Sequence, residues 1–247
     1  MLQIIQRKPH ELLNKEKYQL ANSLERYYPT ANEEYINARF SNKYDFDIVL
    51  IKDHGIVLGA SYLKLDRLKT PFYNKEIPVV YFGQALKNEY YQGSVIWRTG
   101  HWYATKNISY FYPIKRTVGL SVISTPKVFE HFTKLFKNHF PSLGLCGAGK
   151  SISIANFLQN TYGQRGLQLK FGSNYCFTIL DFDPIDITED WERHYKAKNE
   201  AINTFFIKNE IIKFEGDRIY DNNIGLIACG YRNPWNFVAK KQLRIEI

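Results

Sequence analysis

Three runs of β-type sequence follow one another between residues 47 and 86, and they constrain the fold more than any other feature of the chain. Residues 47–51 and 56–65 are apolar or alternating, and the four residues between them include Asp53 and Gly55, which favour a tight turn. A loop with Pro71 follows, and residues 77–86 form a third run rich in Val, Tyr and Phe. Because runs joined by so short a turn pair in antiparallel fashion, the sequence predicts a sheet built on a hairpin.

Segments with helical spacing alternate with these strands. Residues 9–28 place Leu12, Leu20 and Leu24 at near-helical intervals, and residues 126–139 place several Phe side chains on one face. A polar loop at 87–94 precedes an aromatic helix that runs to about residue 105. The other expected elements are strands at 108–112, 117–124, 175–180 and 219–229 and a helix at 152–162. Since no repeat or flexible linker divides the chain, we expect one continuous α/β unit, with residues 1–140 as the core and residues 141–247 as a C-terminal elaboration packed on it.

The composition excludes several classes of protein. Hydrophobic residues make up 45% of the 247 residues and aromatic residues 16%, which is incompatible with a disordered or collagen-like chain. Three distant cysteines, Cys146, Cys176 and Cys229, predict neither a disulfide framework nor a structural zinc site. The sequence shows no signal peptide and no apolar stretch of membrane-spanning length, which favours a cytoplasmic protein. The net charge of +9 fits either an anionic partner or a compositional bias without functional meaning.

The segment 77–98 has the order strand, polar loop, helix, which is typical of an anion-binding site. The free backbone N–H groups of the first helical turn and the positive end of the helix dipole would face a ligand held at the loop. Lys87, Gln92, Ser94 and Arg98 would add side-chain donors. The sequence therefore points to this loop as a site for a phosphate-bearing ligand.

The same segment resembles the GNAT superfamily of N-acetyltransferases. Residues 81–95 read Tyr-Phe-Gly-Gln-Ala-Leu-Lys-Asn-Glu-Tyr-Tyr-Gln-Gly-Ser-Val, similar to the strand and the loop, written roughly Q/R-x-x-G-x-G/A, that bind acyl-CoA in that family. Residues 122–129, and residues 205–209 with Gly216 and Asp217, are similar to later motifs of such proteins. The resemblance implies an α/β (α+β) fold with a mixed, mostly antiparallel central sheet flanked by helices, and an acyl-CoA-binding core at 1–140.

The resemblance also implies an activity, the transfer of an acyl group from acyl-CoA, with acetyl-CoA favoured, to a small-molecule or peptide amine by direct attack. No metal is expected to take part. The residues implied in binding the co-substrate lie on the strand and the loop: Gln84, Ala85, Leu86, Gln92, Gly93, Ser94, Val95 and Arg98. A backbone N–H of residues 84–86 would stabilise the oxyanion. The candidate proton acceptors are Tyr110, Tyr112 and Glu89.

Several residues depart from the family pattern and keep other functions open. Val95 and Trp97 stand where small residues are usual, Gln84 stands where many relatives have a carboxylate, and Phe129 or Phe132 stands where a tyrosine often acts as general acid. A non-catalytic GNAT-like binding module is therefore one alternative. An acyltransferase that takes its acyl group from an acidic acyl carrier protein is another, since the basic surface would suit such a partner.

A third alternative comes from residues 144–151, which read Gly-Leu-Cys-Gly-Ala-Gly-Lys-Ser and match the G-x-x-x-x-G-K-S pattern of P-loop nucleotide hydrolases. Such a loop follows a buried strand, whereas residues 137–142 are polar and contain Pro141, so this function is the weaker prediction. Nucleic-acid binding is disfavoured because Lys and Arg are dispersed along the chain. The six histidines show no metal-binding spacing.

Overall fold

The computed structural model describes residues 1–28, 37, 40–41, 45–109, 116–136, 138–141, 157, 169–171, 176–180 and 183–232. The helices in these ranges are α1 (Asn14–Tyr27), α3 (Val95–Asn107), α4 (Pro126–Leu135) and α6 (Glu200–Lys208), with a 3-10 turn η1 (Pro9–Glu11) and a π-helical turn η4 (Trp191–Tyr195). The strands are β1 (Gln3–Arg7), β2 (Asp47–Asp53), β3 (Ile56–Thr70), β4 (Tyr73–Lys87), β5 (Thr117–Ile123), β6 (Asn138–Phe140), β7 (Leu169–Phe171), β8 (Cys176–Ile179), β9 (Ile185–Asp186), β10 (Ile212–Glu215), β11 (Arg218–Asp221) and β12 (Ile224–Arg232).

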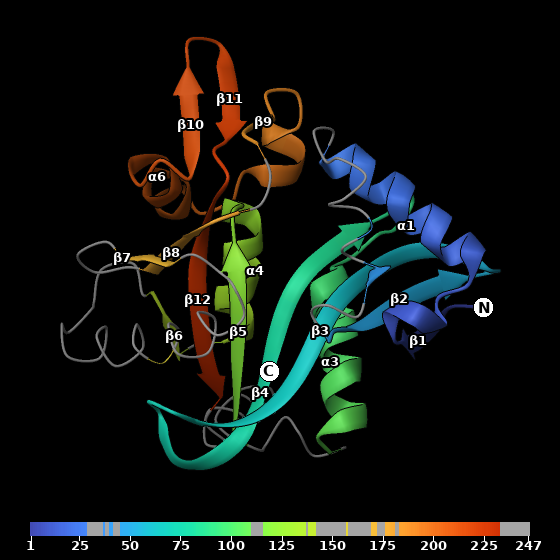
Figure 1. Ribbon diagram of the computed structural model, residues 1–247. Helices are drawn as coiled ribbons and strands as arrows, with labels where there is room; N and C mark the ends of the chain where they lie inside the picture. Colours follow the sequence, from blue (N-terminus) through green and yellow to red (C-terminus); the bar gives the residue numbers. More distant parts are fainter. Residues whose placement is uncertain are drawn as a thin grey trace, which may run out of the picture.

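These strands form one large sheet with helices on both faces and a smaller sheet at one end (Figure 1). The order in the large sheet is β1-β2-β3-β4-β5-β12-β8-β7, with β6 also paired to β12, and β10-β11-β9 make the small sheet. In the described part of the large sheet, β4 and β5 are parallel and all other pairs are antiparallel. This mixed, mostly antiparallel sheet flanked by helices confirms the predicted fold class.

The predicted hairpin is the pair β2–β3, and its turn has the backbone that the sequence implied. His54 and Gly55 both have positive φ, at 45° and 79°. Two consecutive left-handed residues match the right-handed twist of the strands, and glycine adopts this conformation without steric cost. A second hairpin follows directly, because β3 and β4 extend to Thr70 and Tyr73 and leave only a two-residue turn at Pro71.

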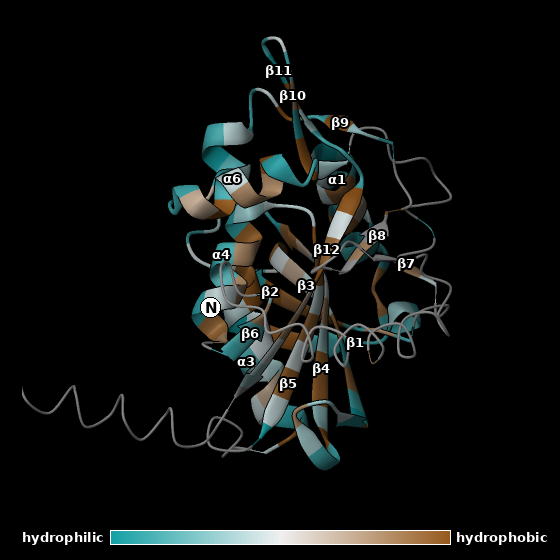
Figure 2. Cartoon of the chain, turned by 90° about the vertical axis from the view of Figure 1, so that its left-hand side faces the viewer, coloured by the Kyte–Doolittle hydropathy of each residue, from teal (hydrophilic) through white to brown (hydrophobic). Residues whose placement is uncertain are grey.

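Alternate residues of the strands pack against different helices. Ile48 and Leu50 of β2 share a core cluster with Leu24 of α1, whereas Val49 between them packs with Tyr103 of α3. Neighbouring residues of a strand point to opposite faces, so α1 and α3 cover opposite faces of the sheet. Figure 2 shows the hydrophobic residues concentrated on the central strands between these layers.

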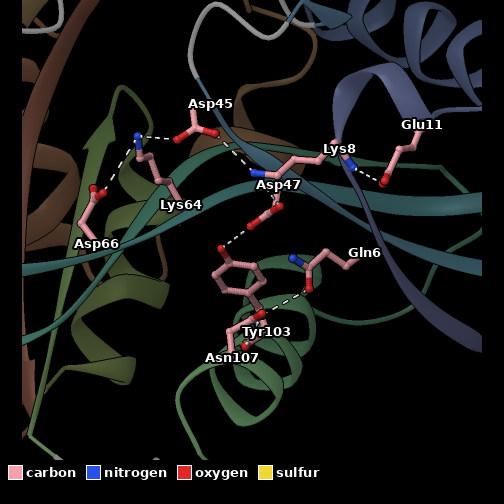
Figure 3. A network of polar contacts seen from close by, with 9 residues as sticks. All are labelled: Gln6, Lys8, Glu11, Asp45, Asp47, Lys64, Asp66, Tyr103 and Asn107. Atoms are coloured by element: carbon pink, nitrogen blue, oxygen red, sulfur yellow. Dashed lines mark hydrogen bonds and ion pairs between the residues drawn. The ribbon is translucent and has the colours of Figure 1, made fainter.

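A polar network fastens α3 to the first two strands (Figure 3). The Tyr103 hydroxyl donates to Asp47 Oδ2 at 2.5 Å, and Lys8 Nζ lies 3.1 Å from Asp47 Oδ1. One turn further along α3, Asn107 Nδ2 donates to Gln6 Oε1 at 3.2 Å. The carboxylate of Asp47 therefore has one partner directly after β1, Lys8, and one on α3, Tyr103. These two contacts fix the helix across the sheet.

Most strands differ from their predicted bounds by a few residues, and three predicted elements are divided or end early in the structure. The helix predicted at 9–28 is divided into η1 and α1, and the helix predicted at 126–139 ends at Leu135. It ends there because Phe136 leaves the helix with extended backbone and turns its ring onto Gly119 and Gly230, where a Cβ atom would come within 2.2 Å and 2.4 Å of it. The strand predicted at 219–229 is two strands, β11 and β12, separated by a turn in which Asn223 has a φ of 49°.

Strand β12 joins the C-terminal part of the chain to the central sheet. It pairs along its length with β5, from Leu226 opposite Ile123 to Arg232 opposite Thr117. Segments before and after residue 140 thus share one sheet. The division into a core and an elaboration stays a prediction. Most of the predicted helix at 152–162, all but residue 157, and most of the predicted strand at 108–112 lie outside the described residues.

Candidate functional site

The candidate site lies where β4 and β5 diverge. The two strands pair in parallel only from Val79 opposite Val118 to Phe82 opposite Ser121. At this last pair the Ser121 hydroxyl donates to the carbonyl of Phe82 at 2.9 Å. Strand β4 then continues to Lys87 without further pairing to β5. The side of β4 that faces β5 therefore offers backbone N–H and C=O groups beyond Phe82 that β5 does not take up.

A β-bulge on β4 begins at the same point. Ser61 of β3 pairs with Ala85, and Leu63 of β3 pairs with Phe82. On β4, two residues, Gly83 and Gln84, therefore stand opposite the single β3 residue Tyr62. A bulge bends its strand and increases the local twist, which carries β4 away from β5. Gly83 is needed here, because a Cβ atom would lie 2.9 Å from the carbonyl oxygen of Tyr62.

The loop after β4 ends at the N-terminus of α3, which has a positive character. Gly93 has a φ of 130°, and Ser94 is the N-cap, with its Oγ accepting from the Trp97 N–H at 3.2 Å. The first turn of α3 contains no acidic residue. The N–H groups of the first turn have no acceptor within the helix apart from such caps. Arg98 adds a full positive charge, and its guanidinium lies 6.0 Å from the centroid of the Tyr91 ring. An anion would be stabilised here.

Between α3 and α4 lies a small apolar hollow. It is lined by side chains of both helices and by Val80, Phe82 and Phe136. Its volume of about 20 Å³ has room for roughly one water molecule. The rings of Phe82 and Phe136 fill the rest, 6.2 Å apart in an edge-to-face arrangement, and Gly100 leaves the space that the Phe82 ring occupies. This hollow therefore lies beside the paired part of β4 and β5, before the bulge.

The structure brings the predicted strand and loop residues to one region, with different parts exposed. Gln84 and Ala85 lie in or next to the bulge, and Gln92 and Gly93 are exposed in the loop. Leu86 is 1% exposed and Val95 is 5% exposed, and both side chains pack in hydrophobic clusters. Leu86 and Val95, like Gly93, which has no side chain, can therefore contribute only their backbone groups to co-substrate binding.

The predicted proton acceptors are placed only in part. Tyr110 and Tyr112 lie outside the described residues. Glu89 is exposed and pairs with Arg26 at 2.9 Å, and this hydrogen bond holds the pKa of its carboxyl below the usual range. The lowered pKa makes the Glu89 carboxylate a weaker proton acceptor.

One buried acid was not recognised in the sequence. Asp221 on β11 is 2% exposed, and its Oδ1 has no hydrogen-bond partner among the described residues. Burial raises the pKa of Asp221 to about 7, although the Ser124 hydroxyl and the Asn223 N–H, which donate to the carboxylate, act to lower it. Ser124 directly follows β5, but this contact joins residues far apart in the sequence, and no local pattern signals it.

The P-loop-like segment 144–151 lies outside the described residues. Among the helices that the structure describes, none is both long enough and apolar enough to cross a membrane.

Comparison with known proteins gives structural similarities and no sequence relative. No protein-family model matches the chain, and no curated protein matches it. Among solved structures, an IAA acetyltransferase from Bacillus cereus aligns with a TM-score of 0.35 and 12% identity over 94% of this chain and 100% of that one. An acyl-CoA N-acyltransferase from Pseudomonas aeruginosa aligns with a TM-score of 0.32 and 13% identity over 70% of this chain and 92% of that one. N-acetylglutamate synthase from Neisseria gonorrhoeae, solved with coenzyme A and N-acetyl-glutamate, aligns with a TM-score of 0.33 and 15% identity over 62% of this chain and 32% of that one.

These TM-scores are too low to support an argument about function. The fold is assigned from the topology of this chain: a mostly antiparallel sheet, one parallel pair β4–β5 that diverges after four residue pairs, a bulge on β4 at the divergence, and a helix N-terminus after β4. These features agree with what the resemblance of residues 81–95 implies, a mixed, mostly antiparallel sheet flanked by helices with a strand that diverges before a loop and a helix.

Proposed function

We propose that the protein is an acyltransferase that moves an acyl group, with acetyl favoured, from acyl-CoA to an amine. The observation that carries this proposal is the divergence of β4 from β5 directly before the N-terminus of α3. An extended thioester arm needs backbone partners along its length, and a pyrophosphate needs N–H donors and positive charge. The two requirements are met by neighbouring segments of this chain.

The chain has groups suited to both ends of acyl-CoA. Gln92, Gly93, Ser94 and the first-turn N–H groups of α3 would bind the pyrophosphate, with Arg98 supplying a charged donor. The backbone of β4 beyond the bulge would hold the pantetheine amides. A backbone N–H of residues 84–86 would donate to the carbonyl oxygen of the thioester, where negative charge develops in the transition state.

The reaction needs no covalent enzyme intermediate. The amine nitrogen attacks the thioester carbon, the C–N bond forms as the C–S bond breaks, and coenzyme A leaves as the thiolate. The nitrogen must lose one proton, which Tyr110 or Tyr112 is proposed to accept, with Glu89 as a weaker candidate because of its ion pair with Arg26. Alignment of the two substrates would supply much of the rate enhancement.

Calorimetric titration with acetyl-CoA, longer acyl-CoAs and coenzyme A tests the proposal. We expect binding by the wild type, and about tenfold weaker binding after Arg98→Gln, since one charged hydrogen bond to a phosphate is lost. Lys106→Gln is the matched control, because Lys106 lies near the other end of α3, over the ring of Trp102. Absence of binding to every one of these ligands would refute the proposal.

A second function, a non-catalytic binding module, is favoured by one observation. Phe129 and Phe132 on α4 are 0% and 4% exposed and belong to the main core cluster, so neither position supplies a hydroxyl to the site. The two functions are separated by assaying thioester turnover with a panel of amines, with acyl-CoA and acyl carrier protein as donors. Tight binding without turnover of any donor would favour the binding module.

A further inference from the structure

Four cationic residues lie near the ends of β4 and β5, where Lys127 contacts the backbone of η4 and interacts with two other lysines. They are Lys87 at the end of β4, Lys127 in the first turn of α4, Arg193 in η4 and Lys198 before α6, and they are called the cation cluster below. Lys127 Nζ donates to the backbone carbonyl of Arg193 at 2.6 Å, and the charge of Lys127 interacts with those of Lys87 and Lys198. None of the four forms an ion pair with another residue that the structure describes.

Each acidic side chain nearby has its ion-pair partner outside the cation cluster, although Glu130 also accepts from the backbone N–H of Lys198 at 3.3 Å. Glu130 pairs with Lys134 at 3.2 Å, and Glu89 pairs with Arg26 at 2.9 Å. Asp190 lies 3.6 Å from a histidine ring of the same turn. Glu130 and Glu89 still act on the charges of Lys127 and Arg193, so the positive charge of the cation cluster is offset only in part.

The position of Lys127 is unfavourable on local grounds. It lies in the first turn of α4, which has no acidic residue, and there its charge meets the positive end of the helix dipole. Burial is the main cause of the lowered pKa values of Lys127, His131 and His194; neighbouring cations lower them further, while Glu130 and Asp190 act in the opposite direction. A local conflict of this kind is typical of a binding site whose ligand supplies the missing charge.

The cation cluster lies mainly on other elements than the N-terminus of α3, although Lys87 is also among the donors expected at the loop before that helix. Strands β4 and β5 both point toward the end of the sheet where η4 and the end of α1 meet (Figure 1). There the Tyr27 hydroxyl donates to the carbonyl of Lys87 at 2.8 Å, and the rings of Tyr27 and His194 lie 6.4 Å apart. The cation cluster thus draws on β4, α4, η4 and the segment before α6, whereas the proposed pyrophosphate site draws on the loop 88–94 and α3.

We propose that the cation cluster binds the negatively charged group, a phosphate or a carboxylate, of the acceptor substrate, so that the acceptor is an anionic amine. This inference rests on the acyltransferase function proposed above. The two anion sites then serve different substrates, with the diverging strands between them. The acceptor amine would be held at the divergence by an anchor on Lys127 and Arg193.

The first test measures anion binding alone. Inorganic phosphate and pyrophosphate are titrated into the wild type, Lys127→Gln and Arg193→Gln. The thermal midpoint of each variant is measured to verify that the variant is folded. Phosphate binding is expected to weaken at least tenfold in both variants. Lys213→Gln is the control, since Lys213 is an exposed lysine paired with Glu215 on β10 and its loss removes the same charge. Equal phosphate affinity in all four proteins overturns the inference.

The second test measures the choice of acceptor. Matched amines with and without an anionic group are compared as acceptors with acetyl-CoA: ethanolamine against phosphoethanolamine, and ethylamine against β-alanine. At least a tenfold higher kcat/KM is expected for the anionic member of one pair, and which pair responds distinguishes phosphate from carboxylate. Lys127→Gln should remove this preference and leave the KM for acetyl-CoA unchanged.

Two results would contradict the inference in this second test. Equal kcat/KM within both pairs would show that no anionic anchor is used. A raised KM for acetyl-CoA in Lys127→Gln, with the acceptor preference intact, would assign the cation cluster to the donor. If no acyl-CoA binds at all, the acyltransferase function fails, and the phosphate titration still decides whether the cation cluster binds anions.

Discussion

The buried carboxyl group of Asp221 makes a quantitative prediction about stability. Its pKa is about 7 in the folded protein, compared with 3.8 for an exposed aspartate, because burial disfavours the charged form. That difference corresponds to roughly 4 kcal/mol of unfavourable free energy when the folded protein must hold an ionised Asp221. Asp221→Asn keeps the size and shape of the side chain and removes the charge.

The sign of the pH dependence follows from proton binding. Between pH 4 and pH 7 the folded state keeps the proton on Asp221 while the unfolded state has lost it, so the free energy of unfolding of the wild type should fall as the pH rises. Above pH 7 this contribution is constant. The variant lacks this decrease. An amide donor without an acceptor would cost about 1–3 kcal/mol, so at pH 8 a net gain of roughly 1–3 kcal/mol is expected for Asp221→Asn.

Urea denaturation at pH 5, 6, 7 and 8 measures the difference between the two proteins. Asp183→Asn is the control, because Asp183 is exposed and its replacement removes the same charge at the surface. The difference in unfolding free energy between Asp221→Asn and the wild type should rise toward the higher pH. A constant difference across the four pH values would show that Asp221 does not titrate in this range and would refute the reasoning.

Three further substitutions test other contacts. Glu16 is 1% exposed, and its carboxylate lies 2.6 Å from Lys52 Nζ. Lys52→Met removes this main counter-charge and should lower the free energy of unfolding, measured by urea denaturation, by about 3–5 kcal/mol. Lys52→Arg should restore part of the lost stability. Tyr103→Phe removes the hydroxyl that donates to Asp47 and should lower the free energy of unfolding by about 1–3 kcal/mol, while the far-ultraviolet circular dichroism stays unchanged. Gly100→Ala brings a Cβ atom to 2.6 Å from the Phe82 ring and should lower the thermal midpoint, and the paired change Phe82→Leu should recover it; no recovery would contradict the packing argument.

The sequence predicted the parts of the fold that depend on neighbouring residues. The β2–β3 hairpin follows from a turn with Gly55, and α3 begins directly after the polar loop at 87–94, as the sequence indicated. The bulge at Gly83 could not be predicted, because it depends on the register of β4 against β3. The end of α4 was misplaced because Phe136 turns toward glycines on two strands that lie far from it in the sequence.

The candidate site likewise has a part that could be predicted from the sequence and a part that could not. Residues 84–98 form one continuous segment, and their grouping could be predicted from their order. The cation cluster comes from four elements that meet only after the C-terminal part of the chain has packed on α4. Asp221 and Ser124 likewise come together only in the folded protein, so their contact has no counterpart in the sequence.

The position of β12 has a consequence for synthesis of the protein on the ribosome. Strand β5 pairs with β4 on one side and with β12 on the other, and β12 is the last described strand to be made. Until residues 224–232 have left the ribosome, β5 has an open edge that can pair with another chain. A nascent or truncated chain that stops before Ile224 should therefore depend on chaperones and aggregate readily, although the strands around the bulge are already present.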